Sequence, residues 1–196
     1  MAAKNTSFPP LISGLILAGG AGRRAGNRDK GLVDWQGKPL VSHVYQHMSR
    51  HVDEVLISCN RNLEQYAKLG AETFVDQRTD FQGPLAGIEA ATPHIKHDFL
   101  FIAPCDCPGL PDNLAQRLLH ALLNDRQVNI AYARNHGSDH YLCAVLRKDC
   151  LGSLGPFRDN GGRAVRHWFK QCGAQAVEFE GPTALVLNSN HPPEAE

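Results

Sequence analysis

The stretch Leu15-Ile-Leu-Ala-Gly-Gly-Ala-Gly-Arg-Arg-Ala-Gly-Asn-Arg-Asp-Lys-Gly31 joins a short apolar segment to a basic, glycine-rich segment. Glycines let the backbone approach an anion and point N–H groups at it, while arginine and lysine neutralise charge that amides cannot. Residues 23–30 carry one acidic residue, Asp29, and four basic ones: Arg23, Arg24, Arg28 and Lys30. The stretch therefore predicts a β-strand that leads into a loop binding a polyphosphate.

The residues on both sides of this loop predict alternating strands and helices. The expected elements are strand 14–18, helix 37–51, strand 54–59, helix 62–69, strand 72–75, helix 83–91, strand 99–103, helix 111–124, strands 128–133 and 141–146, helices 150–154 and 162–172, and strands 176–179 and 184–187. This alternation indicates an α/β fold, a three-layer sandwich around a Rossmann-like, mostly parallel sheet. The strands at 128–133 and 141–146 are close enough in sequence to pair antiparallel.

Length and composition limit the class of protein. A chain of 196 residues that is 42% hydrophobic suits one well-buried domain, and we expect a flexible lead-in at residues 1–12 before a single domain at residues 13–196. Twenty basic and twenty acidic residues give no net charge, which argues against nucleic-acid binding. No stretch approaches the roughly 18 apolar residues of a membrane span, and residues 1–10 lack a signal-peptide core. A cytoplasmic protein without membrane contact is therefore expected.

Cysteine and histidine give no recognised metal motif. The six cysteines include no C-x-x-C, and most lie in apolar runs, where reduced cysteine acts as a small hydrophobe. Cys105 and Cys107 have one residue between them, whereas structural zinc sites use C-x₂₋₄-C with a second pair. The ten histidines show no H-E-x-x-H or comparable spacing. We interpret them as surface and packing residues.

Three polar groups follow predicted strands. They are the glycine-rich loop, the pair Ser58 and Asn60, and Asp106. In a parallel α/β sheet the ligand lies beyond the carboxyl ends of the strands. Ser58 and Asn60 are two residues apart in an extended segment, so both side chains face the same way. We expect the three groups to line one crevice.

The glycine-rich loop allows other interpretations. Gly20-Ala-Gly22-Arg-Arg-Ala25 nearly fits the dinucleotide fingerprint G-x-G-x-x-G/A, but the next predicted helix begins well after it and no acidic residue ends the second strand. A P-loop requires G-x-x-x-x-G-K-[ST], and no Ser or Thr follows Lys30. A glycine turn with incidental arginines stays open, although four basic residues so close together repel each other without an anion.

The pattern L-x-L-A-G-G-x-G-x-R-x-G-x-x-D-K-G resembles the molybdenum cofactor guanylyltransferases. The resemblance continues through Gly37-Lys-Pro-Leu40, Ser58-Cys-Asn-Arg61, Gly83-Pro-Leu-Ala-Gly87 and Pro104-Cys-Asp-Cys-Pro108, and it runs from residue 14 to about residue 190. It implies a magnesium-dependent nucleotidyltransferase that transfers GMP from GTP to molybdopterin cofactor. The products would be molybdopterin guanine dinucleotide and pyrophosphate.

The same resemblance assigns roles to individual residues. It implies that Lys30 counters phosphate charge as pyrophosphate leaves, that Arg24 matches the family's arginine, and that Asp106 is the Mg²⁺ ligand. A hard cation takes one or two carboxylates when charge builds at a transferred phosphate. The implied nucleotide-binding residues are Leu17, Ala18 and Gly19 at the guanine and nucleoside, Gly20 and Gly22 beside the triphosphate, Lys30, Ser58 and Asn60 for the base, Asp76, and Asp106. Ordinary turn roles for Asp76 and Asp106 stay open.

The carboxy-terminal half resembles the family less closely. Asp139-His140 resembles an Asp/Arg-His-Pro element with Tyr141 in place of proline, and Gly161-Gly-Arg-Ala-Val165 resembles the tract near the pterin site. The pterin-binding residues that the resemblance implies are His140, Arg163, Asn188 and Asn190. A plain surface role for Arg163 stays open.

Two rival functions also stay open. A cytidylyl-transferring relative usually reads Leu-Ala-Ala-Gly where this chain has Leu17-Ala-Gly-Gly20, and the space left by the missing methyl at Gly19 favours the larger base. A catalytically silent nucleotide-binding protein would fit two departures from the family pattern: Ala25, where methionine is common, and His191-Pro-Pro193, where Thr-Pro-Glu is common. The expected partners are GTP, molybdopterin cofactor, and proteins that insert molybdenum or act as chaperones of target molybdoenzymes; the expected state is a monomer.

Overall fold

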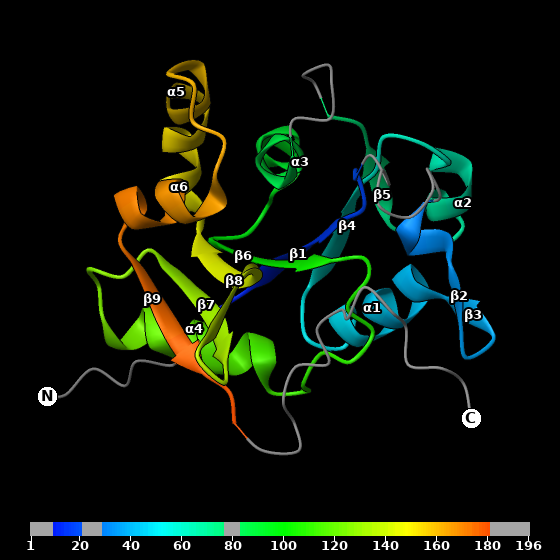
Figure 1. Cartoon of the computed structure of the whole chain (residues 1–196), viewed down its shortest axis with the longest axis horizontal. Helices are drawn as coiled ribbons and strands as arrows, with labels where there is room; N and C mark the ends of the chain where they lie inside the picture. Colours follow the sequence, from blue (N-terminus) through cyan, green and yellow to red (C-terminus); the bar gives the residue numbers. More distant parts are fainter. Residues whose placement is uncertain (1–9, 21–28, 77–82, 181–196) are drawn as a thin grey trace, which may run out of the picture.

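The computed structural model describes residues 10–20, 29–76 and 83–180. Its main sheet has seven strands in the order β5-β4-β1-β6-β8-β7-β9 (Figure 1). These strands are β1 (Ile12–Leu17), β4 (Glu54–Ser58), β5 (Glu72–Phe74), β6 (Phe99–Pro104), β7 (Ile130–Asn135), β8 (Ser138–Arg147) and β9 (Ala174–Glu178). β8 runs antiparallel to β6 and β7, and all other neighbours are parallel. The mostly parallel sheet with an antiparallel strand is confirmed.

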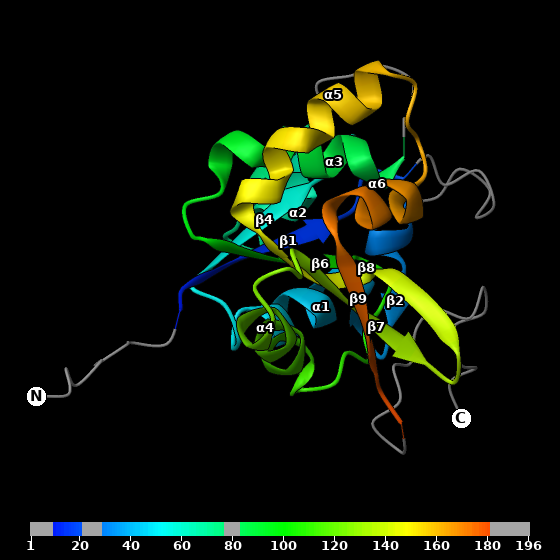
Figure 2. The ribbon, with the colours of Figure 1, turned by 90° about the vertical axis from the view of Figure 1, so that its left-hand side faces the viewer.

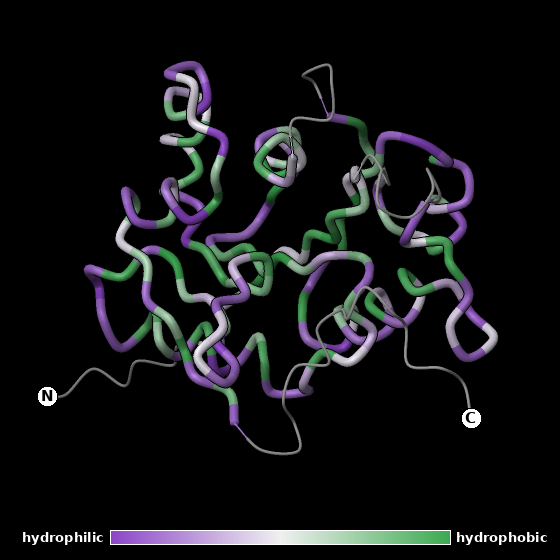
Figure 3. The backbone as a smooth tube through the Cα atoms, in the orientation of Figure 1, coloured by the Kyte–Doolittle hydropathy of each residue, from purple (hydrophilic) through white to green (hydrophobic). Residues whose placement is uncertain are grey.

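Helices cover both faces of this sheet, which gives the expected three layers (Figure 2). One face carries α1 (Leu40–Met48) and α4 (Leu114–Asn124), and the other carries α3 (Pro84–Ala91), α5 (Leu154–Asp159) and α6 (Val165–Cys172). The short helix α2 (Leu63–Ala67) contacts β5. Apolar residues gather along the sheet, and polar residues dominate the outer turns (Figure 3).

The central position of β1 explains its apolar sequence. Ile12 and Ile16 belong to the apolar cluster beneath α1 and α4, whereas Leu15 and Leu17 belong to the cluster beneath α3. A parallel strand that is buried on both faces reads as a continuous apolar run rather than an alternating one. This is why the sequence around residues 14–18 predicts the strand.

A small hairpin between β1 and α1 was not expected from the sequence. β2 (Asp34–Trp35) pairs antiparallel with β3 (Lys38–Pro39). The two residues between them, Gln36 and Gly37, both have positive φ, 52° and 77°. Positive φ at both central positions is the type I′ geometry that matches the twist of a two-residue hairpin. The hairpin delays α1 to Leu40.

Two further elements differ from the sequence-based expectations. The segment expected as a helix at residues 150–154 is the 3-10 helix η4 (Lys148–Ser153), and α5 follows it. Pro156 lies in the first turn of α5, where a missing N–H costs no intrahelical bond. α6 begins at Val165 because Gly161 has a φ of 84° and Ala164 is extended.

The expected strand at 184–187 lies outside the described residues. Within the part of the chain that the structure describes, no helix has the length and apolar character needed to cross a membrane.

Candidate active site

The residues expected in one crevice lie at one edge of the sheet. β5, β4, β1 and β6 are adjacent and parallel, so their carboxyl ends lie side by side. Gly19 and Gly20 follow β1, Asn60 follows β4, Asp76 follows β5, and Asp106 follows β6. This is the edge at which parallel α/β sheets bind ligands.

A hydrogen-bond network joins the ends of β1, β4 and β5. The Asp76 carboxylate accepts hydrogen bonds from Ser58 Oγ at 3.1 Å and from Asn60 Nδ2 at 2.8 Å. Asn60 Oδ1 accepts one from the Asp76 backbone N–H at 2.9 Å, and Asn60 Nδ2 also donates to the Gly19 carbonyl at 3.0 Å. Ser58 and Asn60 therefore do face the same way, and they hold Asp76 beside the start of the glycine-rich loop.

Gly19 is close to this network. A Cβ atom built at Gly19 would lie 2.9 Å from Asn60 Nδ2 and 3.5 Å from the Asp76 carboxylate. The missing methyl therefore leaves room for the Asn60 amide to reach the Gly19 carbonyl. Leu17 and Ala18 are buried, so solvent-accessible groups of β1 and its loop begin at Gly19.

The first half of α3 packs on the ends of β1 and β4. A Cβ at Gly87 would lie 2.7 Å from Ser58 Oγ and 3.0 Å from Leu17 Cδ2, so a side chain does not fit there. Pro84 is the first residue of α3, where proline is favoured. α3 thus begins near the edge that holds the site, and the unpaired N–H groups of a helix start favour anions.

The two residues that flank Lys30 in the chain, Asp29 and Gly31, are both fixed by contacts. The Asp29 carboxylate accepts hydrogen bonds from Tyr66 Oη at 2.6 Å, from Asn62 Nδ2 at 3.0 Å and from the Gly31 N–H at 3.2 Å. A Cβ at Gly31 would lie 2.5 Å from Tyr66 Oη, so the backbone packs directly on that hydroxyl. Burial, Cys105 and Asp29 raise the pKa of Tyr66, and its phenol therefore stays a donor.

Lys30 faces the carboxylate at the end of β6. Lys30 Nζ lies 3.5 Å from Asp106 Oδ2. The Lys30 side chain is 35% exposed and the Asp106 side chain 16% exposed, so both charges are partly screened and accessible. The pair places a cation and a hard oxygen ligand next to each other, where β1 and β6 end.

The segment after β4 connects the two parts of the site. Asn60 donates to the Gly19 carbonyl, Arg61 Nη2 to the Gly20 carbonyl at 3.4 Å, and Asn62 to Asp29. Asn62 has a φ of 55°, a left-handed conformation that asparagine tolerates better than most residues. Residues 60–62 thus contact both ends of the glycine-rich segment, at residues 19–20 and at Asp29.

The thiols near the site are buried. Burial, Asp29 and Asp76 raise the pKa of Cys59 to about 11. Burial also raises the pKa of Cys105, with Asp106 and Asp29 adding to the effect. These cysteines are therefore protonated at neutral pH, and they pack as small apolar side chains, as their sequence context predicts.

The expected pterin-side residues lie apart from this network. The antiparallel β8 brings His140 toward the edge where β6 ends, and burial lowers the pKa of its imidazole despite Asp139. Arg163 Nη1 donates to the carbonyls of Arg158 and Gly162 at 2.9 and 2.8 Å. Arg163 therefore ties together the chain between α5 and α6. Gly22, Arg24, Asn188 and Asn190 lie outside the described residues.

Asp29, Tyr66 and Asn62 were not identified from the sequence as site residues. Asp29 precedes Lys30 in the Asp-Lys-Gly motif, which was the available signal. Its anchoring role depends on α2, which the sequence predicts as a helix without showing which side chain meets the loop.

Comparison with known proteins gives the family. The family model of the MobA-like NTP transferase domain matches residues 14–176. Proteins named molybdenum cofactor guanylyltransferase from Mannheimia succiniciproducens and Shewanella frigidimarina are 38% and 37% identical to this chain. These alignments cover 92% and 93% of this chain, and 94% and 93% of the relatives.

Solved structures share the fold at lower identity. The molybdopterin-guanine dinucleotide biosynthesis protein A of Archaeoglobus fulgidus has a TM-score of 0.67 and 22% identity, covering 85% of this chain and 83% of that one. A CMP:2-keto-3-deoxy-manno-octonic acid synthetase has a TM-score of 0.65 and 15% identity, covering 86% and 89%. With the matched domain, the relatives and the fold in agreement, the chain belongs to the MobA-like NTP transferases and, within them, to the molybdenum cofactor guanylyltransferase family.

Proposed function

We propose that the protein transfers GMP from GTP to molybdopterin cofactor, forming molybdopterin guanine dinucleotide and releasing pyrophosphate. The family places it among nucleotidyltransferases that act in molybdenum cofactor biosynthesis. The observation that carries the proposal is the Lys30–Asp106 pair, 3.5 Å apart where β1 and β6 end. A triphosphate in the glycine-rich loop would bring its phosphates to this pair.

Lys30 would act on the departing phosphates. Its ammonium is held at the start of η2 (Lys30–Leu32), because Asp29 caps this turn and is itself fixed by Tyr66. A positive charge that is positioned in advance stabilises the negative charge developing on the leaving pyrophosphate. The ammonium of Lys30 is a compact donor on a flexible side chain. It would therefore need no large movement to leave Asp106 and contact a phosphate oxygen.

Asp106 fits a magnesium ligand. Its carboxylate is a hard oxygen donor, and the ion takes one or two such groups together with phosphate oxygens and waters. Bound Mg²⁺ would neutralise charge on the phosphates during transfer. Lys30 and Asp106 would together define the phosphate-binding end of the crevice.

The reaction needs no covalent protein nucleophile. The terminal phosphate of molybdopterin attacks the α-phosphate of GTP, and pyrophosphate leaves with the bonding electron pair. The nearby thiols Cys59 and Cys105 are buried and protonated. Catalysis then depends on positioning and electrostatic stabilisation.

Base selection would depend on Gly19 and Asn60. An alanine at Gly19 would push on the Asn60 amide, because its Cβ would lie 2.9 Å away. Asp76 presents a carboxylate beside the loop. Guanine has two adjacent N–H donors, N1–H and N2–H, that one carboxylate can accept together, whereas cytosine has the acceptor N3 beside its amino group. We therefore favour GTP over CTP as donor.

The test is a product assay with molybdopterin acceptor, Mg²⁺ and each nucleoside triphosphate in turn. We expect the guanine dinucleotide and pyrophosphate to form from GTP, and Asp106→Asn and Lys30→Ala each to reduce turnover roughly 10²–10³-fold. Lys68→Ala, at an exposed lysine that follows α2, is the matched control and should leave turnover unchanged.

Two results would reject the proposal. Faster product formation from CTP than from GTP would identify the cytidylyl-transferring activity. GTP binding without pyrophosphate release, in the presence of acceptor and Mg²⁺, would identify a silent nucleotide-binding protein.

A further inference from the structure

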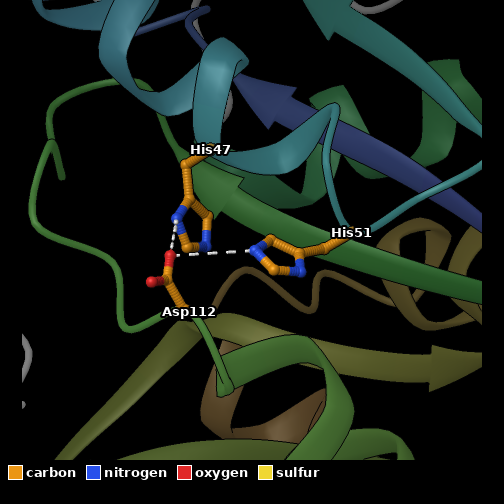
Figure 4. A group of neighbouring side chains, drawn as sticks. All are labelled: His47, His51 and Asp112. Atoms are coloured by element: carbon orange, nitrogen blue, oxygen red, sulfur yellow. Dashed lines mark ion pairs between the residues drawn. The ribbon is translucent and has the colours of Figure 1, made fainter.

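Two histidines and an aspartate meet on the sheet face that carries α1 and α4, away from the nucleotide edge. His47 lies in the last turn of α1, and His51 follows four positions later, one helical turn further along the chain. Asp112 lies in the segment between β6 and α4. The two rings and the carboxylate point toward one another (Figure 4).

The spacing of their donor atoms suits one metal ion. Asp112 Oδ1 lies 3.6 Å from His47 Nδ1 and 3.8 Å from His51 Nε2, and one candidate ligand atom from each residue lies within 4.8 Å of the others. Metal–ligand bonds of about 2.0–2.1 Å place tetrahedral ligands roughly 3.3 Å apart. Small side-chain rotations would therefore close the cluster around an ion.

One ring nitrogen of each histidine lacks a hydrogen-bond partner in the described part of the chain. His47 Nε2 and His51 Nε2 are buried, and neither has a partner among the residues that the structure describes. The His47 side chain is only 10% exposed. A buried polar atom without a partner is costly and needs an explanation, and an absent ion is one of the recognised explanations. His51 Nε2 is also the atom that faces Asp112, so an ion bound between these two residues would satisfy it.

A simple ion pair explains the cluster less well. Both histidines compete for the same Asp112 oxygen, at distances too long for good hydrogen bonds. Oδ1 of Asp112 instead lies at similar distances from one nitrogen of each ring, an arrangement that one ion between the three side chains would account for.

The surroundings also favour a cation. The carbonyl end of a helix carries partial negative charge, and His47 lies in the last turn of α1. Asp112 adds a full negative charge, and its side chain is 85% exposed, which leaves room for water as a further ligand. Arg50 is the opposing charge in this neighbourhood. A hollow of about 350 Å³, lined in part by Arg50, His51 and Asp53, opens beside the cluster and gives solvent access.

We propose that His47, His51 and Asp112 bind one divalent transition-metal ion of the Zn²⁺ class. Two imidazoles and one carboxylate suit Zn²⁺, Co²⁺ or Ni²⁺ rather than Mg²⁺, which prefers an all-oxygen shell. The ion joins the end of α1 to the segment that leads into α4. This site is distinct from the Asp106 site and does not depend on the proposed transfer reaction.

The test uses the full chain without an affinity tag, freed of metal by a chelator. Zn²⁺ binding is measured by calorimetry and Co²⁺ binding by visible absorption, with thermal unfolding as a third readout. We expect one Zn²⁺ per chain, a higher Tm with Zn²⁺, and a Co²⁺ spectrum without thiolate charge-transfer bands. Asp112→Asn and His51→Gln keep the side-chain size and should each weaken Zn²⁺ at least about tenfold.

Two matched variants complete the test. His120→Gln, at an exposed histidine of α4, and Asp106→Asn, at the nucleotide edge, should both retain the bound Zn²⁺. Unchanged affinity in Asp112→Asn and His51→Gln would overturn the proposal. Loss of the ion in Asp106→Asn, or thiolate bands in the Co²⁺ spectrum, would also overturn it by placing the ion elsewhere.

Discussion

Replacing Tyr66 by phenylalanine tests how Lys30 is positioned. Tyr66 is fully buried, and its hydroxyl donates to Asp29 at 2.6 Å while packing on the Gly31 backbone. A hydrogen bond to a charged acceptor contributes about 1.5–3 kcal/mol. Asp29 keeps its donors Asn62 and Gly31 in the variant, so we expect the free energy of unfolding to fall by about 1.5–2 kcal/mol.

Loss of the hydrogen bond from Tyr66 to Asp29 should also slow catalysis, because Asp29 caps the turn that carries Lys30. With Asp29 less firmly held, the turn that carries Lys30 is less ordered, and we expect kcat to fall roughly tenfold, equivalent to about 1.4 kcal/mol of transition-state stabilisation. Urea unfolding and steady-state kinetics measure the two effects. Tyr45→Phe, at a partly buried tyrosine of α1, is the matched control and should preserve kcat.

A double-mutant cycle identifies the interaction. Tyr66→Phe and Asp29→Asn should show a coupling energy of about 0.5–3 kcal/mol in urea unfolding, because the two side chains contact each other. Additive effects, or a Tyr66→Phe variant within about 0.5 kcal/mol of the parent protein, would refute the reasoning.

Three further perturbations test other contacts of the structure. Gly19→Ala should raise KM for GTP at least severalfold, because its Cβ displaces the Asn60 amide; an unchanged KM would mean that this contact does not shape the base site. Asp76→Asn should also raise KM for GTP and should lower Tm, because its amide oxygen can accept from Ser58 or from Asn60 Nδ2 but its amide nitrogen cannot accept from the other; KM for GTP and Tm are measured together. Burial raises the pKa of Glu54, but hydrogen bonds from Lys96 and Ser13 outweigh it, and the net pKa lies below 4.5. A depressed folded-state pKa gives stability that is complete above pH 4.5 and lost as the pH falls further, so Glu54→Gln should flatten this part of the curve of unfolding free energy against pH.

The sequence predicts the sheet well where burial decides the pattern. β1 and β6 are apolar on both faces because both lie in the centre of the sheet, and β8 is antiparallel because only the short turn at His136 and Gly137 separates it from β7. The hairpin of β2 and β3 depends on two positive φ values at Gln36 and Gly37. Glutamine carries little signal for that conformation, so local pattern alone does not reveal it.

The site is predictable only where its residues follow strands. Ser58, Asn60 and Asp106 come directly after β-strands, and parallel topology then brings them to one edge. For Asp29 the sequence shows a charge that offsets the loop's basic residues and a place in the Asp-Lys-Gly motif, but not its anchoring role, because its partner Tyr66 comes from a helix elsewhere in the chain. His47 and His51 have helical spacing, but Asp112 is distant in sequence. The repeat of apolar residues along a helix or strand does not reveal long-range side-chain contacts of this kind.

The connection between β4 and α2 holds both ends of the glycine-rich segment. At the start of the loop sequence, the carbonyls of Gly19 and Gly20 accept hydrogen bonds from Asn60 and Arg61. At its end, Asp29 accepts hydrogen bonds from Asn62 and Tyr66. All four donors come from residues 60–66, so one short, well-anchored segment sets the separation between the two ends. Glycine loses more conformational entropy than other residues when it is ordered, and fixing both ends in advance lowers the entropy that phosphate binding must still remove. If the loop binds the triphosphate as proposed, we expect its affinity to depend on this connection as much as on the basic residues of the loop.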